Sequence, residues 1–124
     1  MLSFFKRKSR ILLLDDDVSM QKLASMILRR AGHRVDIVDS GEKAIHAIGR
    51  QDYKALVLDL MMPHAGGMTV LRHLREHSPE LLQRVILLTA TPESVLKSIS
   101  KDVFAVVRKP FQPADLVAAV KRLA

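Results

Sequence analysis

After residue 10, short apolar runs alternate with segments of helical periodicity, and this alternation constrains the fold more than any other feature. Apolar runs cover residues 11–14, 55–58, 85–88 and 103–107, and a further run at 35–38 is interrupted only by Asp36. Continuous runs of this length are typical of strands that are buried on both faces. Helical patterns follow the runs at residues 20–31, 41–48, 68–77, 92–101 and 113–123.

The alternation predicts an α/β fold, in which a doubly wound five-stranded parallel sheet carries helices on both faces. Residues at the helix ends support the boundaries. Gly32 stands where a C-terminal cap belongs, Ser40 can cap the second helix, and Pro113 suits the first turn of the last helix. Ligands of such sheets bind beyond the carboxyl ends of the strands.

The composition limits the class of protein. A chain of 124 residues suits one domain, and a hydrophobic fraction of 48% can supply a core. No apolar run approaches the roughly 20 residues that cross a bilayer, and no secretory signal follows the N-terminus. The absence of cysteine excludes disulfides and thiolate metal sites. We therefore expect a soluble, cytoplasmic domain over residues 11–124.

Residues 1–10 (MLSFFKRKSR) are expected to form a separate basic tail. Lys6, Arg7, Lys8 and Arg10 give this segment a charge of +4, out of a net +7 for the chain. Together with Leu2, Phe4 and Phe5, these cations could make a weak contact with an anionic membrane surface. The plainer interpretation is a frayed terminus without a role.

Polar residues stand at the ends of four predicted strands. Asp15, Asp16 and Asp17 follow the first strand, Asp59 the third, Thr89 ends the fourth and Lys109 follows the fifth. The fold brings most of these side chains into one crevice. Clustered carboxylates repel one another unless a cation is present, and Mg²⁺ binds to carboxylate oxygens and phosphate. A carboxylate can also be a nucleophile that forms an aspartyl phosphate.

With these residues in this order, the sequence resembles the response-regulator receiver family of two-component signalling. The resemblance covers residues 10–124 and rests on the segments ILLLDDD, LVLDLMMPHAGG, VILLTA and RKPF. It implies a flavodoxin-like sheet with the strand order 2-1-3-4-5. It also implies that Asp59 accepts a phosphoryl group, that Thr89 and Lys109 contact that group, and that Mg²⁺ is held by Asp15, Asp16, Asp59 and the backbone carbonyl of Met61.

The resemblance further implies a switch and not an enzyme. A histidine kinase or a histidine phosphotransfer protein would supply the phosphoryl group, and a changed protein-binding face would contact a downstream target that the sequence does not identify. The peptide bond between Lys109 and Pro110 would be cis, as in the family. The chain ends soon after the last predicted helix, so it is either a stand-alone receiver or a piece of a longer protein.

The sequence departs from the family pattern at several positions. Asp17 adds a third consecutive acid, which we expect to point away or to cap the first helix. Gly66 stands where the family often has aspartate. Val106, three residues before the lysine, replaces the usual aromatic residue, and the segment before the fifth strand is shortened. Phe104 is the only aromatic residue of that strand, and alternation predicts that it shares a face with Val106.

Other functions remain open at this stage. Asp15, Asp17 and Ser19 fit the opening motif of a small aspartyl-phosphate phosphohydrolase of the haloacid dehalogenase type, with Asp15 as nucleophile and Asp17 as acid and base. That hypothesis leaves Asp59 unexplained. The basic charge alone suggests nucleic acid. We do not expect that partner, because the chain has one tyrosine, no tryptophan and no recognition motif.

Overall fold

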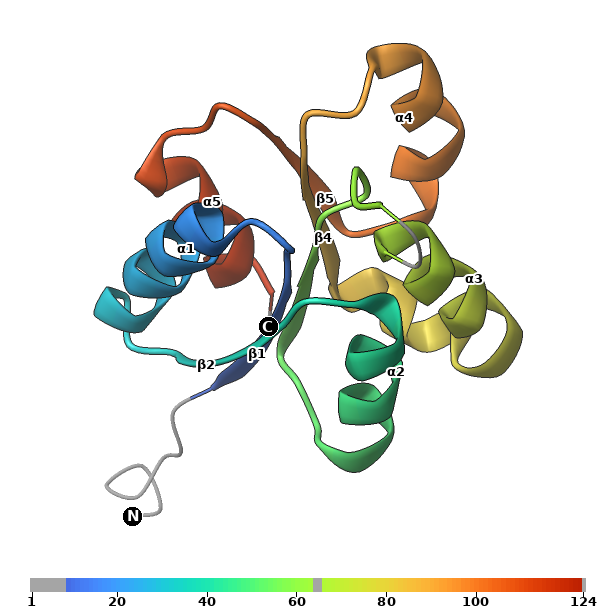
Figure 1. Cartoon of the computed structure of the whole chain (residues 1–124), viewed down its shortest axis with the longest axis horizontal. Coiled ribbons are helices and arrows are strands. Elements are labelled where there is room, and N and C mark those ends of the chain that lie inside the picture. Colours follow the sequence, from blue (N-terminus) through green and yellow to red (C-terminus); the bar gives the residue numbers. More distant parts are fainter. Residues whose placement is uncertain (1–8, 64–65, 124) are drawn as a thin grey trace.

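The computed structural model describes residues 9–63 and 66–123 (Figure 1). The elements follow one another as the alternation predicts. In chain order they are β1 (Arg10–Leu14), α1 (Val18–Arg30), β2 (Arg34–Val38), α2 (Gly41–Arg50), β3 (Ala55–Leu58), α3 (Gly67–His77), the 3₁₀ helix η2 (Pro79–Arg84), β4 (Val85–Thr89), α4 (Glu93–Ile99), the 3₁₀ helix η3 (Ser100–Asp102), β5 (Ala105–Arg108) and α5 (Pro113–Lys121).

The strands form one parallel sheet in the order β2-β1-β3-β4-β5, which confirms the predicted doubly wound, flavodoxin-like fold. Figure 1 shows α1 and α5 on one side of the sheet and α2, α3 and α4 on the other. Leu14 of β1 is in register with Val38 of β2 and with Leu58 of β3. The carboxyl ends of these strands therefore lie side by side.

The core consists of two layers, one on each face of the sheet. In β1, Leu12 and Leu14 pack in the layer beneath α2 and α3, whereas Ile11 and Leu13 pack in the layer beneath α1 and α5. All four side chains are fully buried. Each contributes about 1.5–3 kcal/mol of hydrophobic free energy, so the sheet is a rigid platform for the residues that follow its strands.

Capping residues mark the starts and ends of the helices where the sequence indicates. Asp17 is the N-cap of α1, and its carboxylate accepts hydrogen bonds from the backbone N–H groups of Ser19 and Met20. Ser40 caps α2 in the same way. Gly32, just after α1, has a φ of 100°, a conformation that glycine adopts without strain.

Two segments differ from the prediction. Residues Pro79–Arg84 form the 3₁₀ helix η2, and β5 begins at Ala105 instead of Val103 because η3 turns the chain just before it. The expected side-chain alternation fails there: Phe104 packs in the layer of α1 and α5, and Val106 in the layer of α2, α3 and α4. The prediction that these two residues share a face was wrong. Within residues 9–63 and 66–123, no helix is long and apolar enough to cross a bilayer.

Candidate functional site

Three carboxylates converge at the carboxyl ends of β1 and β3. Asp15, Asp16 and Asp59 each offer an oxygen to a group whose members all lie within 4.8 Å of one another. The parallel pairing of the two strands causes this proximity, since the N–H of Asp59 donates to the carbonyl of Leu14 at 3.0 Å. Asp15 and Asp59 are 1% and 5% exposed, whereas Asp16 is exposed. The cluster therefore has a buried base and one open side.

Lys109 joins the cluster from the end of β5. Its ammonium group lies 3.0 Å from a carboxylate oxygen of Asp15 and 3.3 Å from one of Asp59. The peptide bond between Lys109 and Pro110 is cis, as the resemblance implies. The Lys109 N–H also donates to the carbonyl of Thr89 at 3.0 Å. One cation thus lies between the two buried acids.

Burial and charge act against each other on these groups. Burial raises the pKa of Asp15, although a backbone hydrogen bond and Lys109 act in the opposite direction. Burial alone would lower the pKa of Lys109, but its hydrogen bond to Asp15 and the charges of Asp15 and Asp59 outweigh burial and raise it. The lysine therefore stays charged, and the cluster keeps an excess of negative charge that a further cation would neutralise.

Local hydrogen bonds fix the direction of the two buried carboxylates. The N–H of Asp17 donates to one oxygen of Asp15 at 2.9 Å, and the side-chain amide of Gln21 donates to the Asp15 carbonyl at 2.6 Å. The N–H of Met61 donates to one oxygen of Asp59 at 3.0 Å. Since these donors are backbone groups or lie on α1, the acids are held before any ligand arrives.

Gly67 packs closely against the backbone of Asp59. Its N–H donates to the carbonyl of Asp59 at 3.0 Å. A Cβ atom at this position would lie only 2.5 Å from the same carbonyl oxygen. The start of α3 can therefore approach Asp59 this closely only because residue 67 has no side chain.

The donor set fits a hard divalent cation. Carboxylate oxygens, with a backbone carbonyl and water, are the ligands that Mg²⁺ takes in proteins, and the Asp15, Asp16 and Asp59 cluster offers them on its open side. Asp17 is outside this cluster because its carboxylate caps α1. The phosphohydrolase hypothesis thus loses the residue that it needs as acid and base.

Thr89 ends β4 beside Lys109, and its hydroxyl is hydrogen-bonded to Thr91. The side chain is fully buried. Its oxygen lies 2.7 Å from the hydroxyl of Thr91 and accepts the Thr91 N–H at 3.2 Å. Within the described residues, the Thr89 hydroxyl has no hydrogen bond to Asp59 or Lys109.

The structure therefore brings together Asp15, Asp16, Asp59 and Lys109, whereas the Thr89 hydroxyl is hydrogen-bonded to Thr91. Sequence reasoning missed Gln21 and the Thr91 contact, because neither a lone glutamine on a helix nor a second threonine forms a recognisable pattern. The candidate tail falls largely on residues 1–8, which lie outside the described residues, as do His64 and Ala65 of the loop after Asp59.

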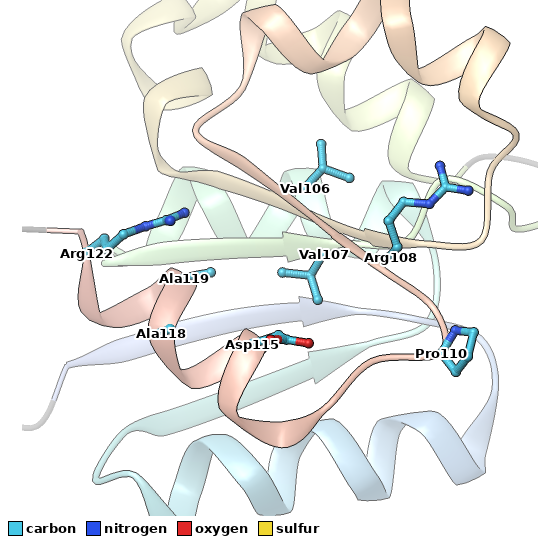
Figure 2. A pocket seen from close by; sticks show the side chains of 8 residues that line it. All are labelled: Val106, Val107, Arg108, Pro110, Asp115, Ala118, Ala119 and Arg122. Carbon is cyan, nitrogen blue, oxygen red and sulfur yellow. The ribbon is translucent and has the colours of Figure 1, made fainter.

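A hollow lies between β5 and α5 at the edge of the sheet, apart from the carboxylate cluster. Figure 2 shows the residues that line it, with Val107 of β5 pointing toward Ala119 of α5 and Arg122 just after that helix. Its volume is about 440 Å³. None of the clustered carboxylates lines this hollow, so it is a separate surface feature.

Known proteins resemble the chain along nearly its whole length. The sequence profile of the response regulator receiver domain matches residues 11–121. The transcriptional regulatory protein GltR of Pseudomonas aeruginosa is 32% identical over 115 residues, which cover 91% of this chain and 48% of GltR. The transcriptional regulatory protein ResD of Bacillus subtilis is 31% identical over 118 residues, which cover 94% of this chain and 48% of ResD.

A solved receiver-domain structure has the same fold as this chain. The receiver domain of the sensor histidine kinase PA1611 from Pseudomonas aeruginosa PAO1 has a magnesium ion coordinated in its active-site cleft. It superposes with a TM-score of 0.83 and 27% identity, over 94% of this chain and 98% of that one. The chain spans about half the length of the curated relatives GltR and ResD.

Proposed function

The chain belongs to the response regulator receiver domain family, and from this premise we propose that Asp59 is the residue that accepts the phosphoryl group. A receiver is a phosphorylation-dependent switch of two-component signalling, that is, a phosphoacceptor and not an enzyme. The observation that carries the assignment is the position of Asp59. It is buried, it contacts Lys109 at 3.3 Å, and it shares an acidic cluster with Asp15 and Asp16.

Each neighbour has a proposed role in the transfer. Asp15, Asp16, Asp59 and the backbone carbonyl of Met61 hold Mg²⁺, and the magnesium ion of the PA1611 receiver domain supports this choice of metal. When bound, the ion neutralises charge between the carboxylates and the phosphoryl oxygens. Lys109, which contacts both Asp15 and Asp59, neutralises further charge and pairs with a phosphoryl oxygen.

The phosphoryl group passes directly from a phosphorylated donor to the acceptor. A carboxylate oxygen of Asp59 forms a bond to phosphorus, the bond from phosphorus to the donor nitrogen breaks, and the electron pair stays on that nitrogen. The Thr89 hydroxyl then donates a hydrogen bond to the transferred group. The Met61 N–H, at 3.0 Å from an Asp59 oxygen, holds the carboxylate in one orientation during the attack.

The partners follow from the same chemistry. The donor is a histidine kinase or a histidine phosphotransfer protein in the cytoplasm, because the phosphoryl group on the histidine of either can transfer to a carboxylate. The downstream partner is a protein that recognises the phosphorylated form, and the hollow between β5 and α5 is a suitable surface for that contact. We assign no nucleic-acid contact to this domain.

Residues 1–10 are proposed to be a basic tail, whose last residue, Arg10, begins β1, attached to a receiver domain that covers residues 11–124. The first residues of β1 and β2 are also basic. Arg34 is in register with Arg10, and Arg30 and Arg34 are exposed. This surface could add electrostatic attraction to a weak contact between the tail and an anionic membrane.

The proposed acceptor is tested by phosphorylation in solution. The protein is incubated with Mg²⁺ and acetyl phosphate, and its intact mass is measured. The unchanged protein and Asp17→Asn should gain one phosphoryl group, because Asp17 lies outside the cluster. Asp59→Asn should gain none. Full phosphorylation of Asp59→Asn, together with none in Asp15→Asn, would favour the phosphohydrolase instead.

A further inference from the structure

Thr89 and Thr91, here called the threonine pair, are joined by two hydrogen bonds at the carboxyl end of β4. The two hydroxyl oxygens lie 2.7 Å apart, and the Thr91 N–H donates to the Thr89 oxygen at 3.2 Å. Thr89 is 0% exposed and Thr91 is 4% exposed. The hydroxyl and the backbone N–H of Thr91 therefore both form hydrogen bonds to the Thr89 hydroxyl.

A hydroxyl has one proton to donate. Within the described residues, the only hydrogen-bond partner of the Thr89 hydroxyl is Thr91. If Thr89 is the donor, the remaining proton belongs to Thr91, which is 4% exposed, whereas Thr89 is 0% exposed. This arrangement leaves no buried proton without an acceptor, so it is favoured over the reverse.

We propose that Thr91 is a positioning residue that holds the Thr89 hydroxyl away from Asp59 while the site is unphosphorylated. The inference rests on the proposed function, in which Thr89 donates to the phosphoryl group. The donated proton can go to Thr91 or to the phosphoryl oxygen, but not to both. Phosphorylation therefore has to break the bond between the two hydroxyls, and the strength of that bond opposes the switch.

Breaking the threonine pair frees the chain that leads into α4. Thr91 is followed by Pro92, the N-cap of α4, and then by Glu93, whose carboxylate lies 3.2 Å from the guanidinium group of Arg108 on β5. A hollow of about 180 Å³ lies beneath this segment, with Glu93, Val106 and Arg108 among its lining residues. Since Val106 is small, there is room for the start of α4 to shift when Thr91 is released.

The affinity for a phosphoryl analogue measures the opposing bond. Beryllofluoride with Mg²⁺ binds to a carboxylate in the geometry of an acyl phosphate, and its affinity can be titrated by calorimetry. Thr91→Val keeps the shape of the side chain and removes the hydroxyl. It should bind beryllofluoride about fivefold more tightly than the unchanged protein, which is the effect of one net hydrogen bond. Thr91→Ser restores the hydroxyl and should restore the original affinity.

Two comparisons separate positioning from a general structural effect. Thr69→Val makes the same chemical change in α3. Among residues 9–63 and 66–123 the Thr69 side chain has no hydrogen bond, so this variant should leave the affinity unchanged. In the Thr89→Ala background, Thr91→Val should have no further effect, because the partner hydroxyl is already absent. Equal or weaker binding by Thr91→Val in the otherwise unchanged protein would overturn the proposal, as would an equal gain in the Thr89→Ala background.

A measurement on the unchanged protein avoids any question of folding in the variants. The backbone N–H of Thr91 should exchange with solvent faster when beryllofluoride and Mg²⁺ are bound, because the Thr89 oxygen no longer accepts it. Unaltered protection of this N–H in the bound state would overturn the proposal. If the unchanged protein binds no beryllofluoride, or if Asp59→Asn binds it equally well, the proposed function itself fails and the role of Thr91 fails with it.

Discussion

The side chains of Phe104 and Val106 lie on opposite faces of the sheet, although a single residue separates them in the chain. Phe104 packs in the layer of α1 and α5, where the Arg122 guanidinium lies 5.6 Å from the centre of its ring. Val106 packs in the opposite layer and is in register with Leu87. Thr89 follows Leu87 by two residues on the same strand, so it shares the face of Val106 and not that of Phe104.

Switching should therefore proceed without an aromatic side chain that turns inward beside Thr89. Phe104→Leu should leave the affinity for beryllofluoride within about twofold of the unchanged protein, because Phe104 contacts the other layer. The Phe104→Leu substitution should lower the free energy of unfolding by only about 1 kcal/mol. Structures with and without beryllofluoride would decide the matter directly. An inward rotation of Phe104 that accompanies a movement of Thr89 would contradict this expectation.

The phosphorylated state should be long-lived because of Met61. This side chain is 58% exposed and follows Asp59 by two residues, but it offers no strong hydrogen bond to a water that attacks the phosphoryl group. Met61→Asn supplies an amide at that position and should speed dephosphorylation severalfold. The decay of the phosphorylated mass after removal of the donor measures the rate.

Met68→Asn is a matched control for this change, since Met68 is also exposed but lies on α3. Its decay rate should equal that of the unchanged protein. A rate for Met61→Asn that is equal to or slower than that of the control would remove this account of the lifetime.

Binding of Mg²⁺ should be weak and should depend on Asp16. The ion keeps several waters in sites with few protein ligands, which limits its affinity. Asp16→Ala removes one carboxylate from the cluster and should lower the affinity about tenfold or more. Calorimetric titration checks this value. Asp17→Ala should cost about 1 kcal/mol of folding stability through loss of the α1 cap, yet it should bind Mg²⁺ normally, and the reverse order of affinities would refute the assignment of ligands.

Gly67 should tolerate no side chain. In Gly67→Ala the new Cβ atom would lie 2.5 Å from the carbonyl oxygen of Asp59, so the loop and the start of α3 must move. We expect a loss of about 1–3 kcal/mol in the free energy of unfolding by urea and weaker phosphorylation of Asp59. Gly49→Ala in α2 meets no atom of the described residues within 4 Å and should instead gain up to about 1 kcal/mol of folding stability. Similar unfolding midpoints for the two variants would contradict the close approach.

The sequence predicted the platform and the acids better than it predicted the side chains between them. Buried parallel strands produce apolar runs, and polar residues at their ends share one edge, so the positions of Asp15, Asp59 and Lys109 follow from the pattern alone. The cap role of Asp17 was also confirmed, because aspartate before a helix commonly accepts its first N–H groups.

The failed prediction for Phe104 and the direction of the Thr89 hydroxyl, which the sequence left open, both depend on local geometry. The alternation rule placed Phe104 on the face of Val106, but it applies only inside a regular strand, and η3 delays the start of β5 to Ala105. The direction of the Thr89 hydroxyl likewise depends on one side-chain rotation and on a neighbour two residues away. Neither property is encoded in the spacing of apolar residues.

The central claim, that Asp59 carries the phosphoryl group, is tested most directly by locating the modified carboxyl. After incubation with Mg²⁺ and acetyl phosphate, borohydride reduces the acyl phosphate to an alcohol, and peptide mass spectrometry identifies the reduced residue. The account predicts reduction at Asp59, with none at Asp15, Asp16 or Asp17. Reduction at Asp15 with Asp59 intact would contradict it.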